Sequence, residues 1–448
     1  MRDRPSITAL PVPRPSACPG LLRIVAALDG GICRVKLAGG ELSSAQARAI
    51  AAASEACASG VLELTNRSNL QIRGVRDAAQ DELIQRLLDA GLGPRVAGAD
   101  DVRNLLLSPS AGLDPAALFD VRPLAAQLLE LLQDTSDFHA LSAKFALQLD
   151  GGEALAMLEH PHDLWLSALP GGELLAFGLA GCPVDGSLAA VERKQAVALV
   201  DTVLRLFLEL ASPEQTRMRQ LLDGLSVDDF LQHVQARLPF QLRRDESVLG
   251  WRRVAGSSAI ALGAQSQRQA GLQMILAAPP LGRFTAWQLA ALADLAQRHG
   301  DATLRLTPWQ GVLLPNIPAA RCPDLLAELA ALGLLLDSHE PLTHLLACTG
   351  SAACAKGLAD TKADACQLAD LLRAGTLRPQ VHLSGCPRSC AAAHTASFTL
   401  LAQPGGRYQL YQRAAGMAGF GHLLVPSLSI NEAGAWFAAQ PESGTTHD

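Results

Sequence analysis

Four cysteines near the C-terminus are the residues whose type and spacing most clearly predict a chemistry. They form a Cys-x5-Cys pair in ACTGSAAC and a Cys-x3-Cys pair in SGCPRSC, and the segment 355–385 separates the pairs: Cys348, Cys354, Cys386 and Cys390. A cuboidal iron–sulfur cluster needs four soft thiolate ligands that converge on one point. Gly350, Gly385 and Pro387 permit tight turns around such a bulky inorganic core. The motif therefore predicts that these cysteines bind a 4Fe-4S cluster.

A structural zinc site is the main alternative for these cysteines. Zinc ribbons and fingers usually take each ligand pair from a knuckle with about two to four intervening residues, and the spacer of five between Cys348 and Cys354 is atypical. Disulfides are disfavoured because the N-terminal segment MRDRPSITALPVPRP lacks the apolar stretch of a secretory signal, which predicts a reducing, cytoplasmic location. We interpret most of the scattered cysteines as small core residues: Cys18, Cys33, Cys57, Cys182, Cys322 and Cys366.

The composition is that of a large globular protein with several domains. Of the 448 residues, 49% are hydrophobic, but no apolar run approaches the ~18 residues that a membrane-spanning helix requires. The net charge of −6 argues against a nucleic-acid-binding protein, because phosphate binding depends on a surplus of Lys and Arg. The sequence contains no Gly-rich dinucleotide fingerprint and no phosphate-binding loop. Electrons for a redox reaction would therefore come from a partner protein.

The sequence repeats itself at one constant offset. The segment that starts at Gly39 aligns with the segment that starts at Leu281, and LELT at 62–65 aligns with LRLT at 304–307. Each copy reads as a Gly turn, a Ser or Thr helix cap, an amphipathic helix and then an alternating strand. The repeat therefore predicts two copies of a helix packed on a sheet.

The same offset, carried on without a gap, extends the repeat into the cysteine-rich region. It places Cys348 opposite Leu106 and Cys386 opposite Lys144. On this register only the second copy has the cluster motif, and the first copy has polar and cationic groups, including Arg103, at the matching place. We therefore expect the cysteines and these cations to form two walls of one pocket.

The repeat predicts an internally duplicated α+β protein with α/β domains, in four blocks. Residues 1–90 and 241–322 are the two helix–sheet modules. Residues 91–240 are an α/β domain without a cluster, and residues 323–448 are an α/β domain that contains the four cysteines.

These features resemble the sulfite and nitrite reductase superfamily, whose members are duplicated and combine two ferredoxin-like half-modules with two α/β domains. The cysteine spacing is similar to the four-cysteine cluster motif of that superfamily, and the resemblance covers nearly the whole chain. It implies a 4Fe-4S cluster next to a tetrapyrrole whose carboxylates are bound by basic side chains of the first half. In the reductases the tetrapyrrole is sirohaem, and the last cysteine of the motif, here Cys390, also ligates the haem iron.

Within the superfamily, the chain is more similar to the precorrin-3B synthase family of aerobic cobalamin biosynthesis. The similarity lies in the compact length and in CPGLLRIVAALDGG, TNRSNLQIRG, LTPWQGVLLPNIP and CAKGLADT. It implies a monooxygenase that uses dioxygen to hydroxylate C20 of precorrin-3A, a metal-free tetrapyrrole, with formation of a γ-lactone. A ferredoxin or an NAD(P)H-dependent reductase would supply the electrons. An additional mononuclear iron is an open expectation for oxygen activation, and sirohaem is expected only if the chain is a sulfite or nitrite reductase.

Five basic residues are candidates for binding the anionic macrocycle. Arg67 and Arg73 lie six positions apart in TNRSNLQIRG, so on one strand they would face the same side and form one clamp. The resemblance assigns catalytic or anion-binding roles to Arg67, Arg103 and Lys144. Arg388 lies within the second cysteine pair, where it could stabilise a reduced cluster or reach a substrate carboxylate.

One position departs from the reductase pattern. The reductases have a second lysine two positions after the first, whereas this chain has Ala146 after Lys144. Reduction of sulfite or nitrite requires an anion to be held while protons are delivered, whereas dioxygen is neutral. Ala146 therefore favours an oxygenase over a reductase.

Overall fold

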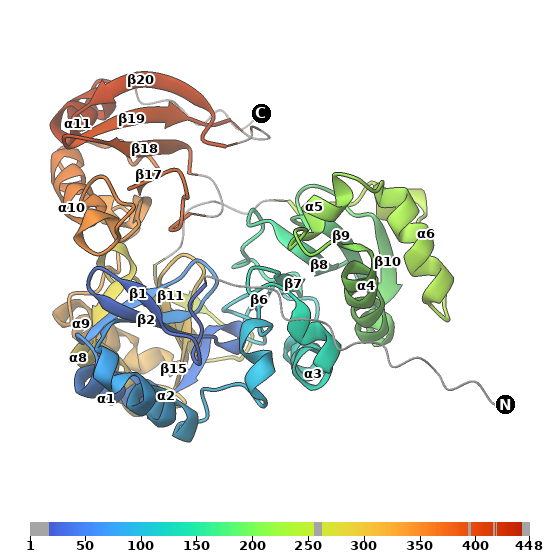
Figure 1. Cartoon of the computed structure of the whole chain (residues 1–448). Helices are drawn as coiled ribbons and strands as arrows, with labels where there is room; N and C mark the ends of the chain where they lie inside the picture. Colours follow the sequence, from blue (N-terminus) through green and yellow to red (C-terminus); the bar gives the residue numbers. More distant parts are fainter. Residues whose placement is uncertain (1–17, 255–261, 393–395, 415–416, 418, 441–448) are drawn as a thin grey trace. The chain divides into compact units, whose positions relative to one another are not determined.

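The computed structural model describes residues 18–254, 262–392, 396–414, 417 and 419–440. These residues separate into two compact units (Figure 1). Unit 1 takes residues 18–22, 93–112 and 116–254, and unit 2 takes 23–92, 113–115 and the described residues from 262 onward. Each unit has its own sheets and its own hydrophobic core.

Unit 2 contains two five-stranded sheets that exchange a strand. The first sheet has the order β1 (Val25–Ala27), β2 (Gly30–Val35), β5 (Leu70–Val75), β4 (Val61–Leu64) and β13 (Arg283–Thr285). The second has the order β11 (Gly263–Ser266), β12 (Leu272–Ala277), β15 (Val312–Pro318), β14 (Thr303–Leu306) and β3 (Glu41–Ser43). Because β13 pairs with β4 and β3 pairs with β14, each copy of the repeat completes the sheet of the other.

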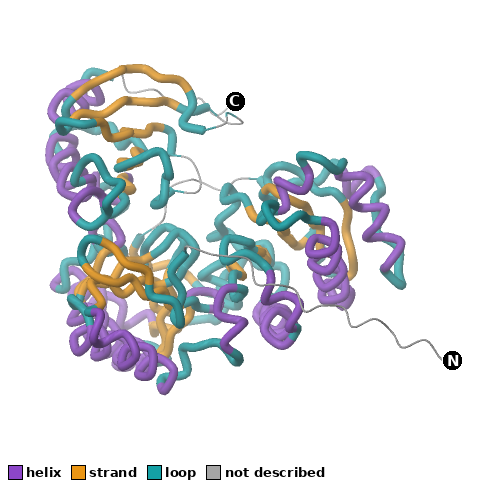
Figure 2. Tube along the Cα trace, in the orientation of Figure 1, coloured by secondary structure: helices purple, strands orange, loops and turns teal. Residues whose placement is uncertain are grey.

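The helices of these two modules confirm the repeat. They are α1 (Ser44–Cys57), α2 (Gln80–Asp89), α8 (Ala286–His299) and α9 (Cys322–Ala331), and α8 and α9 begin at the positions that the offset from Gly39 to Leu281 assigns to α1 and α2. Ser43 and Thr285 cap α1 and α8, each accepting a hydrogen bond at 3.1 Å from the backbone N–H three positions on. Figure 2 shows that these helices gather on one side of the strands.

Two further sheets share one topology. In unit 1 the strands are β6 (Leu105–Leu107), β7 (Leu147–Asp150), β8 (His162–Ala168), β9 (Leu174–Gly181) and β10 (Ala189–Glu192). In unit 2 they are β16 (Leu345–Ala347), β17 (Val381–Ser384), β18 (Phe398–Gln403), β19 (Arg407–Gln412) and β20 (His422–Leu428). Each sheet runs in chain order, with its first three strands parallel and its last two antiparallel to their neighbours. The second α/β domain is therefore a copy of the first.

The remaining helices pack on these sheets. Unit 1 contributes α3 (Arg122–Asp134), α4 (Ala196–Leu210), α5 (Met218–Leu222), α6 (Val227–Arg237) and α7 (Glu246–Leu249), and unit 2 contributes α10 (Thr361–Leu372) and α11 (Ile430–Ala438). Leu368 of α10 and Phe437 of α11 share one core with Leu383 and Leu400 of the sheet, so the two helices cover the same face (Figure 1). No helix among the described residues is long and apolar enough to span a bilayer.

The expected ungapped register is wrong beyond α9. A constant offset from β6 and β7 would start their counterparts at Ala347 and Ser389, whereas β16 starts at Leu345 and β17 starts at Val381. The offset changes twice. The connection from α2 to β6, at 90–104, is longer than that from α9 to β16, at 332–344, and the connection from β6 to β7, at 108–146, is longer than that from β16 to β17, at 348–380. When the strands themselves are matched, Ser108 corresponds to Cys348 and Gly152 corresponds to Cys386. The expected pairings with Leu106 and Lys144 are therefore wrong.

Candidate functional site

The two cysteine pairs follow two neighbouring parallel strands of unit 2. Cys348 comes directly after β16, and Cys386 comes two positions after β17. Ala347 pairs with Leu383, so the C-terminal ends of both strands lie at the same edge of the sheet. Cys354 follows a 3₁₀ turn at Gly350–Ala352, and its N–H donates to the Gly350 carbonyl at 2.9 Å. The topology thus brings the predicted ligands to one edge.

The four thiols are near enough to influence one another electrostatically. Cys390 is exposed at the surface, but partial desolvation of its thiol raises its pKa, and Cys386, Cys348 and Cys354 raise that pKa further. The Gly385 N–H donates to Cys348 Sγ at 3.2 Å, which is the backbone N–H to sulfur contact that an iron–sulfur site uses. Positive iron centres would relieve the mutual repulsion of the thiolates.

Three glycines leave room for backbone to approach closely around Cys348. A Cβ at Gly350, which has a φ of +62°, would lie 2.5 Å from the Ala359 carbonyl oxygen. A Cβ at Gly357 would lie 2.5 Å from the Gly350 carbonyl carbon, and one at Gly385 would lie 3.4 Å from Cys348 Sγ. No group of three or more His, Cys, Asp or Glu among the described residues, these cysteines included, could hold a single metal ion. A 4Fe-4S cluster makes a different demand, because each thiolate binds a separate iron corner, and the turns and the N–H to sulfur contact fit that demand.

Substitution of Gly350 by alanine is expected to prevent stable cluster binding. The new methyl group collides with backbone atoms that cannot move without displacing the loop between Cys348 and Cys354. Iron content per chain after anaerobic reconstitution measures the effect, and we expect it to fall to less than about half of the wild-type value. Gly60→Ala is the matched control, because Gly60 has a φ of +76° but no atom within 4 Å of its Cβ. Both variants share the ~1–2 kcal/mol of left-handed backbone strain, so equal iron content would contradict the role of close packing.

The expected clamp of Arg67 and Arg73 on one strand is wrong. Arg67 is half-buried in the turn before β5, where its N–H donates to Thr65 Oγ1. Arg73 lies on β5, and its side chain is only 3% exposed. It donates to Asp29 at 2.8 and 2.9 Å and to Glu63 at 3.3 Å. The donors of Arg73 are therefore committed to internal carboxylates, and we withdraw its assignment to substrate binding.

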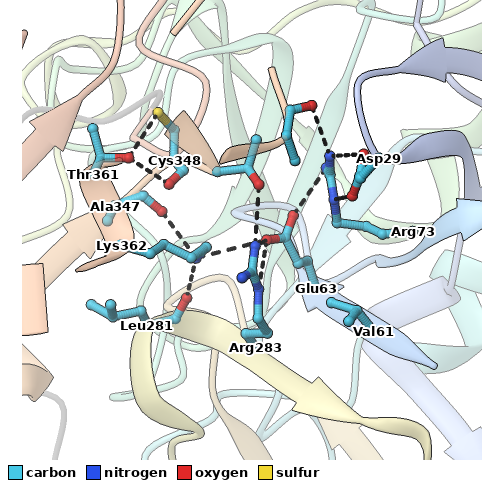
Figure 3. Close-up of polar contacts among 12 residues, drawn as sticks. Asp29, Val61, Glu63, Arg73, Leu281, Arg283, Ala347, Cys348, Thr361 and Lys362 are labelled. Atoms are coloured by element: carbon cyan, nitrogen blue, oxygen red, sulfur yellow. Dashed lines mark hydrogen bonds and ion pairs between the residues drawn. The ribbon is translucent and has the colours of Figure 1, made fainter. Parts of the chain in front are cut away.

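The same carboxylate, Glu63, is the centre of a buried charge network near Cys348 (Figure 3). Glu63 Oε1 accepts from Arg283 at 2.6 and 3.1 Å and lies 3.9 Å from Lys362 Nζ. Burial would raise the pKa of Glu63, but Lys362, Arg73 and Arg283 outweigh it and hold that pKa below its usual value. Burial lowers the pKa of Lys362, and the Glu63 carboxylate offsets only part of that decrease. Glu63, Arg73 and Lys362 are thus held where solvation is poor, whereas the Arg283 side chain is 35% exposed.

Sequence reasoning did not single out Asp29, Glu63, Arg283 or Lys362. The repeat contained one signal for them, because Glu63 and Arg283 occupy the positions of Arg305 and Glu41 in the other copy. At these two positions one copy has the acidic residue where the other copy has the basic one. Such an exchange indicates that each pair forms an ion pair between the two copies. Both pairs form in the structure, across β4–β13 and across β14–β3.

The remaining basic candidates are placed separately. Arg388 is exposed within the second cysteine pair of unit 2. In unit 1, Arg103 donates to the Gly93 carbonyl at 3.2 Å and lies 3.5 Å from Asp100, and burial lowers its pKa. Lys144 is exposed in the turn before β7. Arg103 and Lys144 precede the parallel strands β6 and β7, so they lie at the sheet edge opposite to the positions that match the cysteines. The repeat therefore gives no support to a two-walled pocket, and their assignment rests on the family resemblance.

Buried polar groups occupy the place in unit 1 that corresponds to the cluster edge. Ser108 follows β6 and donates to the Leu155 carbonyl at 2.6 Å. Asp150 ends β7 and accepts a hydrogen bond from Ser167, with Arg253 Nε at 3.1 Å. Burial and the Asp150 carboxylate raise the pKa of Glu153 to about 8. A hydrogen-bonded carboxylate network thus replaces the thiols of the second copy.

The amino-acid sequence matches two protein-family models and several known proteins. The model described as "Nitrite/Sulfite reductase ferredoxin-like half domain" matches residues 27–90 and 265–332, and the model described as "Nitrite and sulphite reductase 4Fe-4S domain" matches residues 98–242. The ferredoxin–nitrite reductase of Synechococcus elongatus is 31% identical over 371 residues, covering 76% of this chain and 70% of that protein. The chain belongs to the nitrite and sulfite reductase family. The expected fold, with two ferredoxin-like half-modules, is thereby confirmed, and the chain is an oxidoreductase of this family.

The chain is also similar to other members of the family. The chloroplastic ferredoxin–nitrite reductase of Zea mays is 32% identical over 395 residues, covering 81% of this chain and 68% of that protein. A precorrin-3B synthase of Sinorhizobium sp is 26% identical over 400 residues, covering 88% of this chain and 82% of that protein. The structure of Mycobacterium tuberculosis NirA matches with a TM-score of 0.75 and 23% identity over 92% of this chain and 82% of that one, which shows the shared fold.

The family match does not include the four cysteines of the predicted cluster motif. Residues 98–242, which match the 4Fe-4S domain, contain Cys182 but none of the four motif cysteines. The domain that contains Cys348 and Cys386 has the same sheet topology as the matched domain. Membership in a family of redox enzymes gives the zinc alternative no support.

Proposed function

We propose that this member of the family is a precorrin-3B synthase, a monooxygenase that hydroxylates C20 of precorrin-3A with formation of a γ-lactone. One atom of dioxygen enters the substrate, and two electrons and two protons reduce the other atom to water. A 4Fe-4S cluster on Cys348, Cys354, Cys386 and Cys390 would pass the electrons one at a time. Arg67, Arg103, Lys144 and Arg388 would bind carboxylates of the macrocycle. We place the enzyme in the cytoplasm, with a ferredoxin or an NAD(P)H-dependent reductase as the electron donor.

The observation that carries this choice is Ala146. Its side chain is buried, and its N–H donates to Asp163 Oδ2 at 2.9 Å. The resemblance to the reductases predicts a second active-site lysine here, which would add a cation for an anionic substrate and a proton donor. Dioxygen requires no such cation. The match to the Sinorhizobium precorrin-3B synthase supports the same choice. It covers 88% of this chain and 82% of that protein, whereas the match to the Synechococcus elongatus nitrite reductase covers 76% and 70%.

The second candidate is a sirohaem-dependent nitrite or sulfite reductase, which the higher identity to the ferredoxin–nitrite reductases favours. An additional mononuclear iron is not part of either proposal, since the described residues provide no group that could hold a single metal ion. One experiment separates the two. The protein, purified anaerobically and reconstituted with iron and sulfide, is incubated with precorrin-3A, a reductant and ¹⁸O₂, and the product is weighed. Incorporation of one labelled atom supports the proposal, whereas extractable sirohaem with reduction of nitrite or sulfite would overturn it.

Loss of a basic side chain is expected to weaken substrate binding without affecting the cluster. We expect Arg67→Ala and Lys144→Ala each to cost about 1.5–3 kcal/mol of binding free energy, which is roughly a 10- to 100-fold rise in Kd. Fluorescence titration with precorrin-3A measures the affinity, and iron content reports the cluster. Lys194→Ala is the control, because Lys194 is an exposed lysine of unit 1 that pairs only at the surface, with Glu192. Unchanged affinity in both variants would remove these residues from the binding site.

A further inference from the structure

The buried charge network of unit 2 contacts the first cysteine loop, residues 347–354, at several points. Lys362 Nζ donates to the Ala347 carbonyl at 3.2 Å and to the Leu281 carbonyl at 2.7 Å. Arg283 donates to Thr349 Oγ1 at 3.1 Å, and Arg73 donates to the Ala353 carbonyl at 3.3 Å. The backbone on the N-terminal side of both cysteines is therefore fixed by cations that belong to other elements (Figure 3).

Thr361 adds a contact to the cysteine itself. Its hydroxyl donates to the Cys348 carbonyl at 2.8 Å and lies 3.5 Å from Cys348 Sγ. Lys362 is the next residue on α10, so the same helical turn places a hydroxyl against the sulfur and an ammonium beneath it. Lys362 Nζ thus lies next to the backbone that leads into Cys348.

With all five side chains ionised, the network has one more positive than negative charge. It joins three cations, Arg73, Arg283 and Lys362, to two carboxylates, Asp29 and Glu63. The side chains of Arg73, Glu63 and Lys362 are at most 12% exposed. Poor solvation strengthens their field at nearby groups, and the net charge around a cluster is one of the factors that set its reduction potential.

The other copy of the repeat has a matching ion pair without a cysteine loop. Arg305 and Glu41 occupy the positions of Glu63 and Arg283, and their contact is 3.3 Å. The buried member of each pair is similarly shielded, since the Arg305 side chain is 6% exposed and the Glu63 side chain is 11% exposed. The Glu63 pair differs in its position beside the cysteine loop, where Arg73 and Lys362 also contact Glu63.

We propose that the network of Asp29, Glu63, Arg73, Arg283 and Lys362 positions the cysteine loop 347–354 and raises the reduction potential of the cluster bound there. The reduced cluster has one more negative charge than the oxidised cluster, so a nearby excess of positive charge favours the reduced state. Lys362 and Glu63 act through the cluster and not on the substrate, which makes them positioning residues. This inference rests on the proposed assignment of the cluster to Cys348, Cys354, Cys386 and Cys390.

Redox titration of the reconstituted full-length protein, followed by EPR, tests the inference with two opposite changes. Lys362→Met removes a positive charge and is expected to lower the midpoint potential, with the ratio of reduced to oxidised cluster falling about tenfold at a fixed potential, or ~59 mV. Glu63→Gln removes a negative charge and is expected to shift the potential the other way. Arg305→Met and Glu41→Gln are the matched controls, because they break the equivalent pair that lacks a cysteine loop, and their potentials are expected to stay at the wild-type value.

The outcomes are distinguishable. Opposite shifts in Lys362→Met and Glu63→Gln, with unshifted controls, support the inference. A full cluster with the wild-type potential in both variants overturns it, and so does an equal shift in the controls. If Lys362→Met loses the cluster while Arg305→Met retains it, the positioning role is supported and Glu63→Gln decides the electrostatic role. A wild-type protein that takes up no iron would instead overturn the cluster assignment.

Discussion

Cys390→Ser is expected to abolish the 4Fe-4S cluster and all activity that depends on it. A serine hydroxyl is a harder and less acidic ligand than a thiol, so one corner of the cluster loses its thiolate. Wild-type protein purified anaerobically should be brown, with broad absorbance near 400 nm and about four iron and four sulfide per chain. The variant should have much less of each, while its circular dichroism stays close to that of the wild type.

Cys366→Ser is the matched control for this change. Cys366 and Cys390 are both exposed cysteines of unit 2, but Cys366 lies on α10 and belongs to neither pair. We expect Cys366→Ser to keep the wild-type iron and sulfide content. Normal cluster content in Cys390→Ser, or equal losses in both variants, would contradict the ligand assignment. Stoichiometric zinc in a colourless wild-type protein would contradict the cluster itself.

The sequence predicted the duplicated modules because nothing is inserted or deleted in them from β2 to α2 and from β12 to α9. Caps, helices and strands recur at one offset from β3 to the start of α9, so Ser43 and Thr285 cap equivalent helices. Beyond α9 the connections between strands differ in length, and an ungapped comparison then pairs residues on opposite edges of a sheet. Lys144 was matched to Cys386 in this way, although Lys144 precedes its strand and Cys386 follows its own. Strand pairing, which sequence similarity in an Ala- and Leu-rich chain does not reveal, restores the correct register.

The spacing of the four cysteines predicts a cluster site, whereas the sequence did not single out the charges around it. Two close cysteine pairs are the pattern that four thiolate ligands of one cluster require. Arg73, by contrast, has the same sequence signature whether it binds a substrate carboxylate or an internal one. Its partner Asp29 is 44 residues away in the chain, and the Ala353 carbonyl is 280 residues away. Only the folded strands bring these groups together, so a buried ion pair was mistaken for half of a binding clamp.

Glu153→Gln is expected to remove a large part of the pH dependence of stability above neutral pH. The Glu153 side chain is fully buried beside Asp150, and its carboxylate accepts from the Gly151 N–H at 2.7 Å. Burial first, and the Asp150 charge second, raise the pKa of Glu153 to about 8. In the unfolded chain a glutamate titrates near its ordinary value of ~4.3. Between these values the folded state binds more protons than the unfolded state.

The sign of the effect follows from this difference. The protonated form of Glu153 stabilises the fold at low pH, and that stabilisation is lost as the pH rises toward the folded pKa. Glutamine mimics the protonated form at every pH, so the advantage of the variant over the wild type should be small near pH 5 and large near pH 8. From the raised pKa, we expect the difference in the free energy of unfolding to grow by on the order of 3 kcal/mol over this range. Urea unfolding of the full chain at the two pH values measures it.

Glu159→Gln is the control for this titration, because Glu159 is an exposed glutamate six positions away on the same segment. Its stability should follow the wild-type pH profile. A Glu153→Gln profile parallel to the wild type would mean that Glu153 is already ionised in the folded protein, in which case two adjacent buried carboxylates would both be charged. Such a pair would need compensating cations beyond Arg253, which lies 3.1 Å from Asp150. The first copy of the domain would then contain a charged site, as the second copy does around its cysteines. The network of Ser108, Asp150 and Glu153 would in that case be a candidate binding site of its own.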